Sequence, residues 1–151
     1  MQVTKLNFRP VKRADYSELR AMIHELYRED PSTKPISDKK ISKTLTELRN
    51  KPQKGQIIVF EDGKTLVGYA ILIPYWSNEY GGTILHIDEL YVKSDHRGRG
   101  VATRFLKRLA HKNHDRVALQ LEVTPSNTRA MNYYHKLGFR KTKNSHLIRM
   151  I

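Results

Sequence analysis

The sequence predicts a mixed α/β fold of the α+β type. We expect a single domain over residues 1–151, with a largely antiparallel central sheet of about six to seven strands and about four flanking helices. Short β-rich runs are interleaved with segments that repeat apolar residues at helical spacing. Apolar residues, 38% of the chain, occur along its whole length without a low-complexity tract, so one continuous core is expected.

The first part of the chain contains one predicted strand and two predicted helices. Val3 to Arg9 alternates apolar and polar residues, as a strand does. Asp15 is placed to cap a helix. Ser37 or Asp38 begins a second helix that stops near Pro52, because proline disfavours a helical residue before it. The apolar residues of the first helix recur at helical spacing: Leu19, Met22, Ile23 and Leu26.

Three further strands are predicted in the middle of the chain. Residues 56–60 and 66–74 are β-rich and flank an Asp-Gly pair, which is a strong signal for a tight antiparallel hairpin. A polar and aromatic loop over residues 75–82 precedes another strand, over residues 83–92. That strand leads directly into a glycine-rich turn.

Two helices and at least one strand are predicted after the turn. The first helix follows the turn at once, and a strand covers residues 117–123. The second helix begins at Asn127, continues through Tyr134 and closes at Leu137-Gly138. From Phe139 onward the chain is expected to return as one or two strands. The apolar face of the first of these helices contains Val101, Phe105, Leu106 and Leu109.

Composition excludes several classes of protein. The absence of cysteine excludes disulfides, thiolate metal sites and a cysteine nucleophile, and no run approaches the ~18 apolar residues of a membrane span. The polar first five residues lack the core of a signal peptide, so we expect a cytoplasmic protein without a membrane partner. The net charge of +13 favours anionic partners. The basic residues are spread along the chain rather than gathered in one arm, so nucleic acid is not expected, although charge alone leaves it open.

The glycine-rich turn, Arg97-Gly98-Arg99-Gly100, has the features of an anion site. It joins a predicted strand to a predicted helix, where the first backbone N–H groups have no partner within the helix. Glycines let phosphate oxygens approach the backbone, and the helix dipole favours negative charge there. Neither the P-loop pattern nor the dinucleotide pattern G-x-G-x-x-G fits, because Thr103 stands where the third glycine of the latter belongs.

Two motifs in order carry a resemblance to a known family. Arg97-Gly98-Arg99-Gly100-Val101-Ala102 fits the pattern R/Q-x-x-G-x-G/A, and Asn127-x-x-Ala130-x-x-x-Tyr134-x-x-Leu137-Gly138-Phe139 forms a second block. Over about residues 56–140 the sequence resembles the GNAT superfamily of N-acetyltransferases. The resemblance implies a GNAT-type domain that moves acetyl from acetyl-CoA to a primary amine by direct attack in a ternary complex. The amine belongs to a small molecule, a protein N-terminus or a lysine.

The resemblance also implies which residues contact the cosubstrate. The backbone of Tyr91 and Val92 should pair with the pantetheine arm, the amides from Gly98 to Thr103 with the pyrophosphate, and Asn127 with the pantetheine side. The full expected set is Tyr91, Val92, Arg97, Gly98, Arg99, Gly100, Ala102, Thr103, Asn127 and Tyr134.

Acetyl transfer needs a neutral amine, a stabilised oxyanion and a proton for the departing thiolate. By the resemblance, Tyr134 lies near the cofactor sulfur and is the expected general acid. Asp88 and Glu122 are equally ranked candidates for the base, with Glu89 below them, and a water relay is the alternative. Alternation places Asp88 and Glu89 on opposite sheet faces, and a bulge in this strand, which the resemblance makes common, would change which of them points into the cleft. No metal is expected, because the spacing of His111 and His114 lacks a third ligand.

Two other functions stay open at this point. One is a basic nucleic-acid-binding module, and the other is an acyl-CoA sensor without turnover. A homodimer is possible, although no interface can be identified from the residues. The acceptor is also open. Glu79, Asp88 and Glu89 would make a locally acidic cleft for an amine. Trp76 and Tyr80 either line that cleft or cover the sheet.

Overall fold

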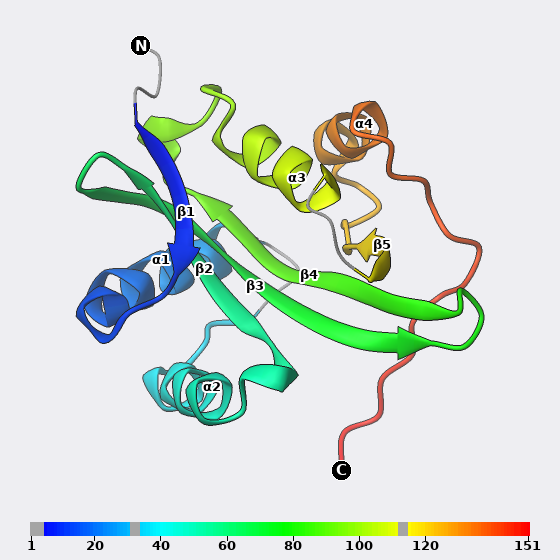
Figure 1. Ribbon diagram of the computed structural model, residues 1–151, viewed down its shortest axis with the longest axis horizontal. Helices are drawn as coiled ribbons and strands as arrows, with labels where there is room; N and C mark the ends of the chain where they lie inside the picture. Colours follow the sequence, from blue (N-terminus) through cyan, green and yellow to red (C-terminus); the bar gives the residue numbers. More distant parts are fainter. Residues whose placement is uncertain (1–4, 31–33, 112–114) are drawn as a thin grey trace.

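A five-stranded sheet with helices on both faces forms the centre of the computed structural model (Figure 1), which describes residues 5–30, 34–111 and 115–151. The strand order is β1-β2-β3-β4-β5; neighbours are antiparallel except for the parallel pair β4 and β5. The strands are β1 (Leu6–Pro10), β2 (Gln56–Asp62), β3 (Thr65–Ser77), β4 (Gly82–Val92) and β5 (Arg116–Gln120). The helices are α1 (Tyr16–Glu29), α2 (Asp38–Asn50), α3 (Val101–His111) and α4 (Thr128–Lys136).

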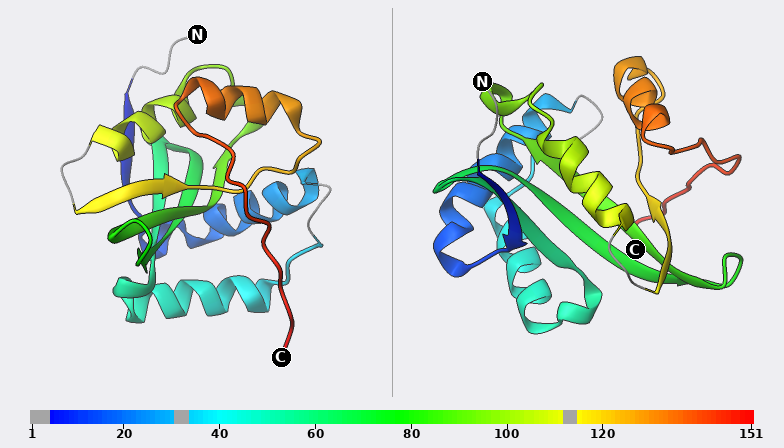
Figure 2. Two further views of the ribbon diagram at one scale, coloured as in Figure 1. Left: turned by 90° about the vertical axis from the view of Figure 1, so that its right-hand side faces the viewer. Right: turned by 45° about the horizontal axis from the view of Figure 1, so that its top comes forward.

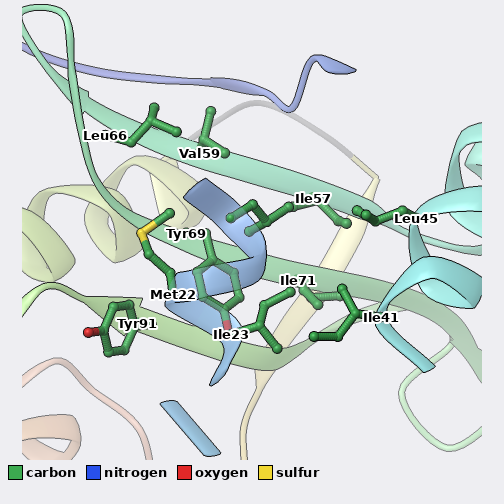
Figure 3. Packing of buried hydrophobic residues seen from close by; sticks show 11 residues of the cluster. Met22, Ile23, Ile41, Leu45, Ile57, Val59, Leu66, Tyr69, Ile71 and Tyr91 are labelled. Atoms are coloured by element: carbon green, nitrogen blue, oxygen red, sulfur yellow. The ribbon is translucent and has the colours of Figure 1, made fainter. Parts of the chain in front are cut away.

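Helices α1 and α2 cover one face of the sheet. The predicted apolar face of α1 is confirmed: Leu19, Met22 and Ile23 are buried, and Leu26 packs against the same cluster. Figure 3 shows Met22 and Ile23 of α1 and Ile41 and Leu45 of α2 on the same face of the sheet as Tyr69 and Tyr91. Burial of each large apolar side chain contributes roughly 1.5–3 kcal/mol, so this face is a main source of stability.

Helices α3 and α4 lie over the opposite face (Figure 2). The predicted apolar residues of α3 are all buried. Phe105 from α3 meets Phe8 of β1 and Phe60 of β2, with ring centroids 5.3 and 4.6 Å away. The resulting aromatic cluster holds α3 on the sheet and thereby sets the position of the glycine turn before it.

The two helix starts differ in how their polar residues act. Ser37 caps α2 as predicted, and its hydroxyl accepts a hydrogen bond from the Lys40 N–H at 3.2 Å. Asp15 occupies the predicted N-cap position of α1, but its side chain makes no capping hydrogen bond. Its carboxylate instead accepts two hydrogen bonds from the Arg9 guanidinium, at 2.7 and 2.9 Å. A charge-assisted bidentate pair is stronger than a cap, and Asp15 is buried.

The number of strands is smaller than predicted. The strand expected from Phe139 onward is not formed in the described segment 139–151, where Leu147 and Ile148 are exposed instead of paired. The hairpin is longer than predicted, since β3 continues through Ser77 and includes Tyr75 and Trp76 of the expected loop. The last strand, β5, ends at Gln120 rather than 123. The part of the first predicted strand before residue 5 lies outside the described residues.

Within the described residues, no helix combines the length and the apolar character that a bilayer crossing requires.

Candidate active site

The centre of the candidate site is the place where β4 and β5 part. The two strands pair only between residues 83–86 of β4 and 116–120 of β5. The partner strand on the other side, β3, stays paired with β4 as far as Val92. Among the described residues, one edge of β4 from Ile87 to Val92 therefore has no partner strand, and its backbone groups are available to another extended chain.

The glycine turn follows directly at the end of β4. Gly98 and Gly100 have φ angles of 75° and 80°, a region that L-residues with side chains rarely adopt. No atom lies within 4 Å of a Cβ built on either glycine, so the turn presents open backbone. The first amide that bonds back to the turn is the N–H of Arg104, which reaches the Gly100 carbonyl at 3.0 Å. The amides before it point out of the start of α3, as a bound anion requires.

Arg97 links the turn to its surroundings. Its Nε donates to the Val92 carbonyl at 2.8 Å, and a terminal nitrogen donates to Glu29 at 2.6 Å. The guanidinium also lies 5.4 Å from the centroid of the Tyr91 ring. The Arg97 side chain, which is predicted to contact the cosubstrate, thus holds the turn against β4 and α1.

A bulge in β4 decides which carboxylate faces which side of the sheet. Ile71 lies opposite Glu89, whereas the next residue of β3, Leu72, lies opposite Ile87, so Asp88 is the extra residue. Ile87 packs on the α3 side, and strict alternation would place Glu89 there too. The bulge shifts the alternation by one residue, and Glu89 instead contacts residues of the α1 face.

Both carboxylate oxygens of Glu89 accept hydrogen bonds from tyrosines. Tyr27 of α1 donates to Oε2 and Tyr69 of β3 to Oε1, each at 2.8 Å. Burial raises the pKa of Glu89 above its ordinary value, the charge of Asp88 adds to this rise, and the two tyrosine bonds oppose it. Glu89 lines a cleft of about 1090 Å³, whose other walls include Tyr27, Ile36, Ile71, Ile73 and Asp88.

Asp88 and Glu122, the two carboxylates that the sequence favours as the base, are more exposed than Glu89. The Asp88 side chain is 52% exposed and lies 3.6 Å from Nε2 of His86. The Glu122 side chain is 70% exposed and lies 3.2 Å from Nδ1 of His146. Sequence reasoning underrated Glu89 because the bulge depends on the register with β3, which the residues of β4 alone do not reveal.

Tyr134 lies on the other side of the sheet. It lines a groove of about 1040 Å³ between α3, β5, α4 and residues 137–146, together with Glu122. Its ring packs 5.1 Å from that of Tyr133 and 5.6 Å from that of Phe139. Burial raises the pKa of Tyr134 to about 12, so the phenol carries its proton at neutral pH. The structure thus places Tyr134 with Glu122 in one groove and Asp88 with Glu89 in another.

Two further predicted contact residues have structural partners. Oγ1 of Thr103 lies 2.8 Å from the Tyr133 hydroxyl, which joins α3 to α4. Asn127 caps α4 by accepting a hydrogen bond from the Ala130 N–H at 3.1 Å. The Tyr133 hydroxyl thus adds a polar link between α3 and α4 that the sequence does not reveal.

Trp76, Glu79 and Tyr80, the other candidates for the acceptor cleft, do not line either cavity. Trp76 and Tyr80 are 69% and 59% exposed and lie at the far end of the β3–β4 hairpin. In the parts of the chain that the structure describes, no three His, Asp or Glu side chains are grouped as a metal site would require. His114, one of the two histidines considered for a metal, lies outside the described residues.

The balance of basic and acidic residues differs between the two parts of the chain. Residues 99–151 contain 12 of the 28 Lys and Arg residues but only two of the 15 acidic ones, Asp115 and Glu122. This segment forms α3, β5 and α4. The side of the molecule that carries the glycine turn therefore has a field that attracts anions.

Comparison with known proteins agrees with this arrangement. The model of the Acetyltransferase (GNAT) family matches residues 19–139. The chain belongs to this family. The match includes the glycine turn, the bulged strand and Tyr134, which are the features of the candidate site.

Individual relatives of this GNAT chain are more distant. It is 32% identical over 78 residues to thialysine N-epsilon-acetyltransferase from Bos taurus, a stretch that is 50% of this chain and 45% of that protein. The porcine (Sus scrofa) protein of the same name is 30% identical over 80 residues, 52% of this chain and 46% of its own length. The chain therefore spans about half the length of the curated relatives it matches.

Solved structures share the fold over the whole chain. A possible acetyltransferase from Clostridium difficile 630 has a TM-score of 0.84 at 19% identity, covering 98% of this chain and 99% of that one. The ribosomal-protein-alanine N-acetyltransferase from Brucella melitensis biovar Abortus 2308 has a TM-score of 0.75 at 19% identity, covering 96% and 99%. At these identities the likeness shows the fold.

Proposed function

We propose that the chain is an acetyl-CoA-dependent N-acetyltransferase that moves acetyl to a primary amine by direct attack in a ternary complex. The observation that carries this proposal is the parting of β4 from β5 immediately before the open glycine turn. An unpaired strand edge suits an extended amide-bearing arm, and the free amides at the start of α3 suit its pyrophosphate. Membership of the GNAT family supports both assignments.

The residues present fit acetyl-CoA. The backbone of Tyr91 and Val92 would pair with the pantetheine arm, and the amides from Gly98 to Thr103 would bind the pyrophosphate, with Arg99 adding charge. When bound, acetyl-CoA supplies a thioester carbonyl that an amine can attack. A backbone N–H on the unpaired edge of β4, near Val92, would stabilise the oxyanion.

Proton transfers are proposed for side chains on the two sides of the sheet. Tyr134 keeps its proton at neutral pH and would donate it to the departing thiolate. Among the three carboxylates we favour Glu89 as the base, because its raised pKa brings it closer to the range useful for accepting a proton near neutrality. Asp88 and Glu122 are the alternatives. Separate Asp88→Asn, Glu89→Gln and Glu122→Gln variants distinguish the three.

For the acceptor we propose an aliphatic primary amine. The cleft beside Glu89 contains three carboxylates and two lysines next to the apolar side chains of Ile36, Ile71 and Ile73. The charged residues are Lys39, Lys43, Glu47, Asp88 and Glu89. Such a surface fits an ammonium group on a hydrocarbon stem. The similarity to proteins named thialysine N-epsilon-acetyltransferase supports this class. A protein N-terminus is the competing acceptor, and a panel of amines and short peptides separates the two.

Thermal unfolding with acetyl-CoA, free CoA and ATP tests the proposal. A ligand at ~100 times its Kd stabilises the folded state by ~2.7 kcal/mol, which raises the Tm by several degrees for a chain of this length. We expect this rise with acetyl-CoA and CoA but not with ATP, and not in Gly100→Glu. A rise without acetylation of any amine would indicate an acyl-CoA sensor. No rise, together with salt-dependent RNA or DNA binding, would favour the nucleic-acid module.

A further inference from the structure

The carboxylate of Glu89 is held from two different layers of the molecule. Tyr27 reaches it from α1, and Tyr69 reaches it from the neighbouring strand β3. Tyr69 is completely buried and belongs to the core cluster beneath α1 and α2, whereas Tyr27 lines the cleft. Figure 3 shows Tyr69 surrounded by apolar side chains of that cluster. One bond therefore comes from the floor of the cleft and the other from its wall.

Burial of the Glu89 carboxylate costs free energy unless hydrogen-bond donors are placed to receive it. A carboxylate removed from water is costly unless donors replace its hydration, and a phenol O–H is a strong donor. Burial raises the pKa of Tyr69, and burial followed by the bond to Glu89 raises that of Tyr27. Both phenols therefore remain donors at every pH at which an amine is acetylated. An ionised carboxylate has about four acceptor positions, so two are left for an acceptor amine.

We propose that Tyr27 and Tyr69 are positioning residues that hold the Glu89 carboxylate at the acceptor cleft and keep it ready to take a proton from the amine. This inference rests on the proposed function. In the step concerned, the N–H bond of the acceptor ammonium breaks, its proton forms an O–H bond with Glu89, and the electron pair stays on nitrogen for attack on the thioester. The tyrosines transfer no proton in this step.

Other charged groups also surround Glu89. Asp88 is adjacent on β4 and disfavours the ionised form of Glu89, and His86 lies near Asp88 rather than Glu89. From α2, Lys39, Lys43 and Glu47 line the same cleft, and Glu47 is paired with Lys51 and Lys54. The hydrogen bonds to Glu89 come from Tyr27 and Tyr69, so the two tyrosines are the contacts to change.

Tyr27→Phe and Tyr69→Phe test the inference, with Tyr16→Phe as the matched control. Tyr16 lies on the same helix as Tyr27 and packs against the same cluster. Loss of one hydrogen bond to a carboxylate should move the acidic limb of the pH profile of kcat/KM upward by about one pH unit. The rate well above that limb should change less than about three-fold. Tyr16→Phe should leave the profile in place.

A titration of the Glu89 carboxyl by ¹³C NMR, assigned with Glu89→Gln, provides a readout that needs no activity. We expect its midpoint to rise in both test variants. Unchanged midpoints, or a uniform loss of rate at every pH, would overturn the inference. If Tyr69→Phe does not fold, Tyr27→Phe carries the test alone, since Tyr27 is only partly buried. If the wild-type protein acetylates no amine, the proposed function fails, while the titration still decides whether the tyrosines control Glu89.

Discussion

Arg97 and Glu29 form an ion pair with 2.6 Å between a guanidinium nitrogen and a carboxylate oxygen. Arg97 begins the glycine turn, and Glu29 is the last residue of α1. The same guanidinium donates to the Val92 carbonyl at the end of β4. One side chain therefore connects the proposed cofactor turn with the helix that also carries Tyr27, a residue of the proposed acceptor cleft.

Glu29→Gln should weaken CoA binding by about two- to five-fold, because a partly exposed ion pair is worth ~0.2–1 kcal/mol. The variant leaves the turn less well oriented but removes none of its amides. Isothermal titration calorimetry with CoA measures the effect. Glu25→Gln is the matched control, since Glu25 lies one turn earlier on α1 and pairs with Arg28 of the same helix. No weakening by Glu29→Gln, or equal weakening in both variants, would show that the Arg97–Glu29 pair does not orient the turn.

Gly98→Ala and Gly100→Ala should each destabilise the fold by about 1–2 kcal/mol and weaken CoA binding by roughly ten-fold or more. The stability loss follows from their positive φ, and the binding loss from a Cβ on the surface that a phosphate should approach. Gly63→Ala is the control, because Gly63 has a φ of 64° in the distant β2–β3 turn. It should lose similar stability but keep its affinity for CoA. Unchanged affinity in the first two variants would place the anion elsewhere.

Asp15→Asn should lower the free energy of unfolding by about 2–3 kcal/mol at pH 7, because it leaves the Arg9 guanidinium partly buried without its bidentate partner. The hydrogen bond from Arg9 keeps the pKa of Asp15 below its ordinary 3.8. Its stabilisation is therefore present above that value and is lost as pH falls through the lower folded pKa. Urea unfolding at pH 7 and near pH 3 should show the difference between variant and wild type shrinking at low pH. A constant difference would refute the ion-pair account.

Glu89→Gln should become more stable relative to wild type as pH rises. Burial raises the pKa of Glu89 in the folded state, so its protonated form favours folding below the unfolded pKa, and this contribution is lost as pH rises through the folded pKa. Glutamine has no such titration. Urea unfolding of both proteins from about pH 4 to pH 8 measures the trend. A difference independent of pH would mean that Glu89 titrates normally.

Tyr134→Phe should reduce kcat by roughly 10²-fold or more, with a smaller effect on CoA affinity, because it removes the proposed proton donor but keeps the ring packing. Tyr133→Phe is the matched control on the same helix, and it removes only the contact to Thr103. Steady-state kinetics with a fixed amine separates the two variants. Similar rates in Tyr134→Phe and wild type would assign the proton to another donor.

The helices could be predicted from the sequence because their apolar spacing survives in the fold. Leu19, Met22 and Ile23 of α1 and Phe105 of α3 are buried as expected. The hairpin prediction is also confirmed, since Gly63 has the positive φ that a tight turn uses. These features depend on local chemistry, which a single stretch of residues contains.

Features that depend on long-range register could not be predicted. The bulge at Asp88 follows from how Ile71 and Leu72 pair with β4, and it changes which carboxylate enters the cleft. The hydroxyls of Tyr27 and Tyr69 meet at Glu89 from positions 62 and 20 residues away. The strand expected after Phe139 finds no partner strand in the described segment.

The most direct test of the central claim is an acetyl-transfer assay with acetyl-CoA, thialysine and a panel of alkylamines and short peptides. Mass spectrometry identifies the product, and thiol release measures turnover. The account predicts that an aliphatic primary amine gains one acetyl group per CoA released, and that Gly100→Glu abolishes this reaction. Saturating acetyl-CoA binding with no amine acetylated above the protein-free rate, or turnover unaffected by Gly100→Glu, would contradict it.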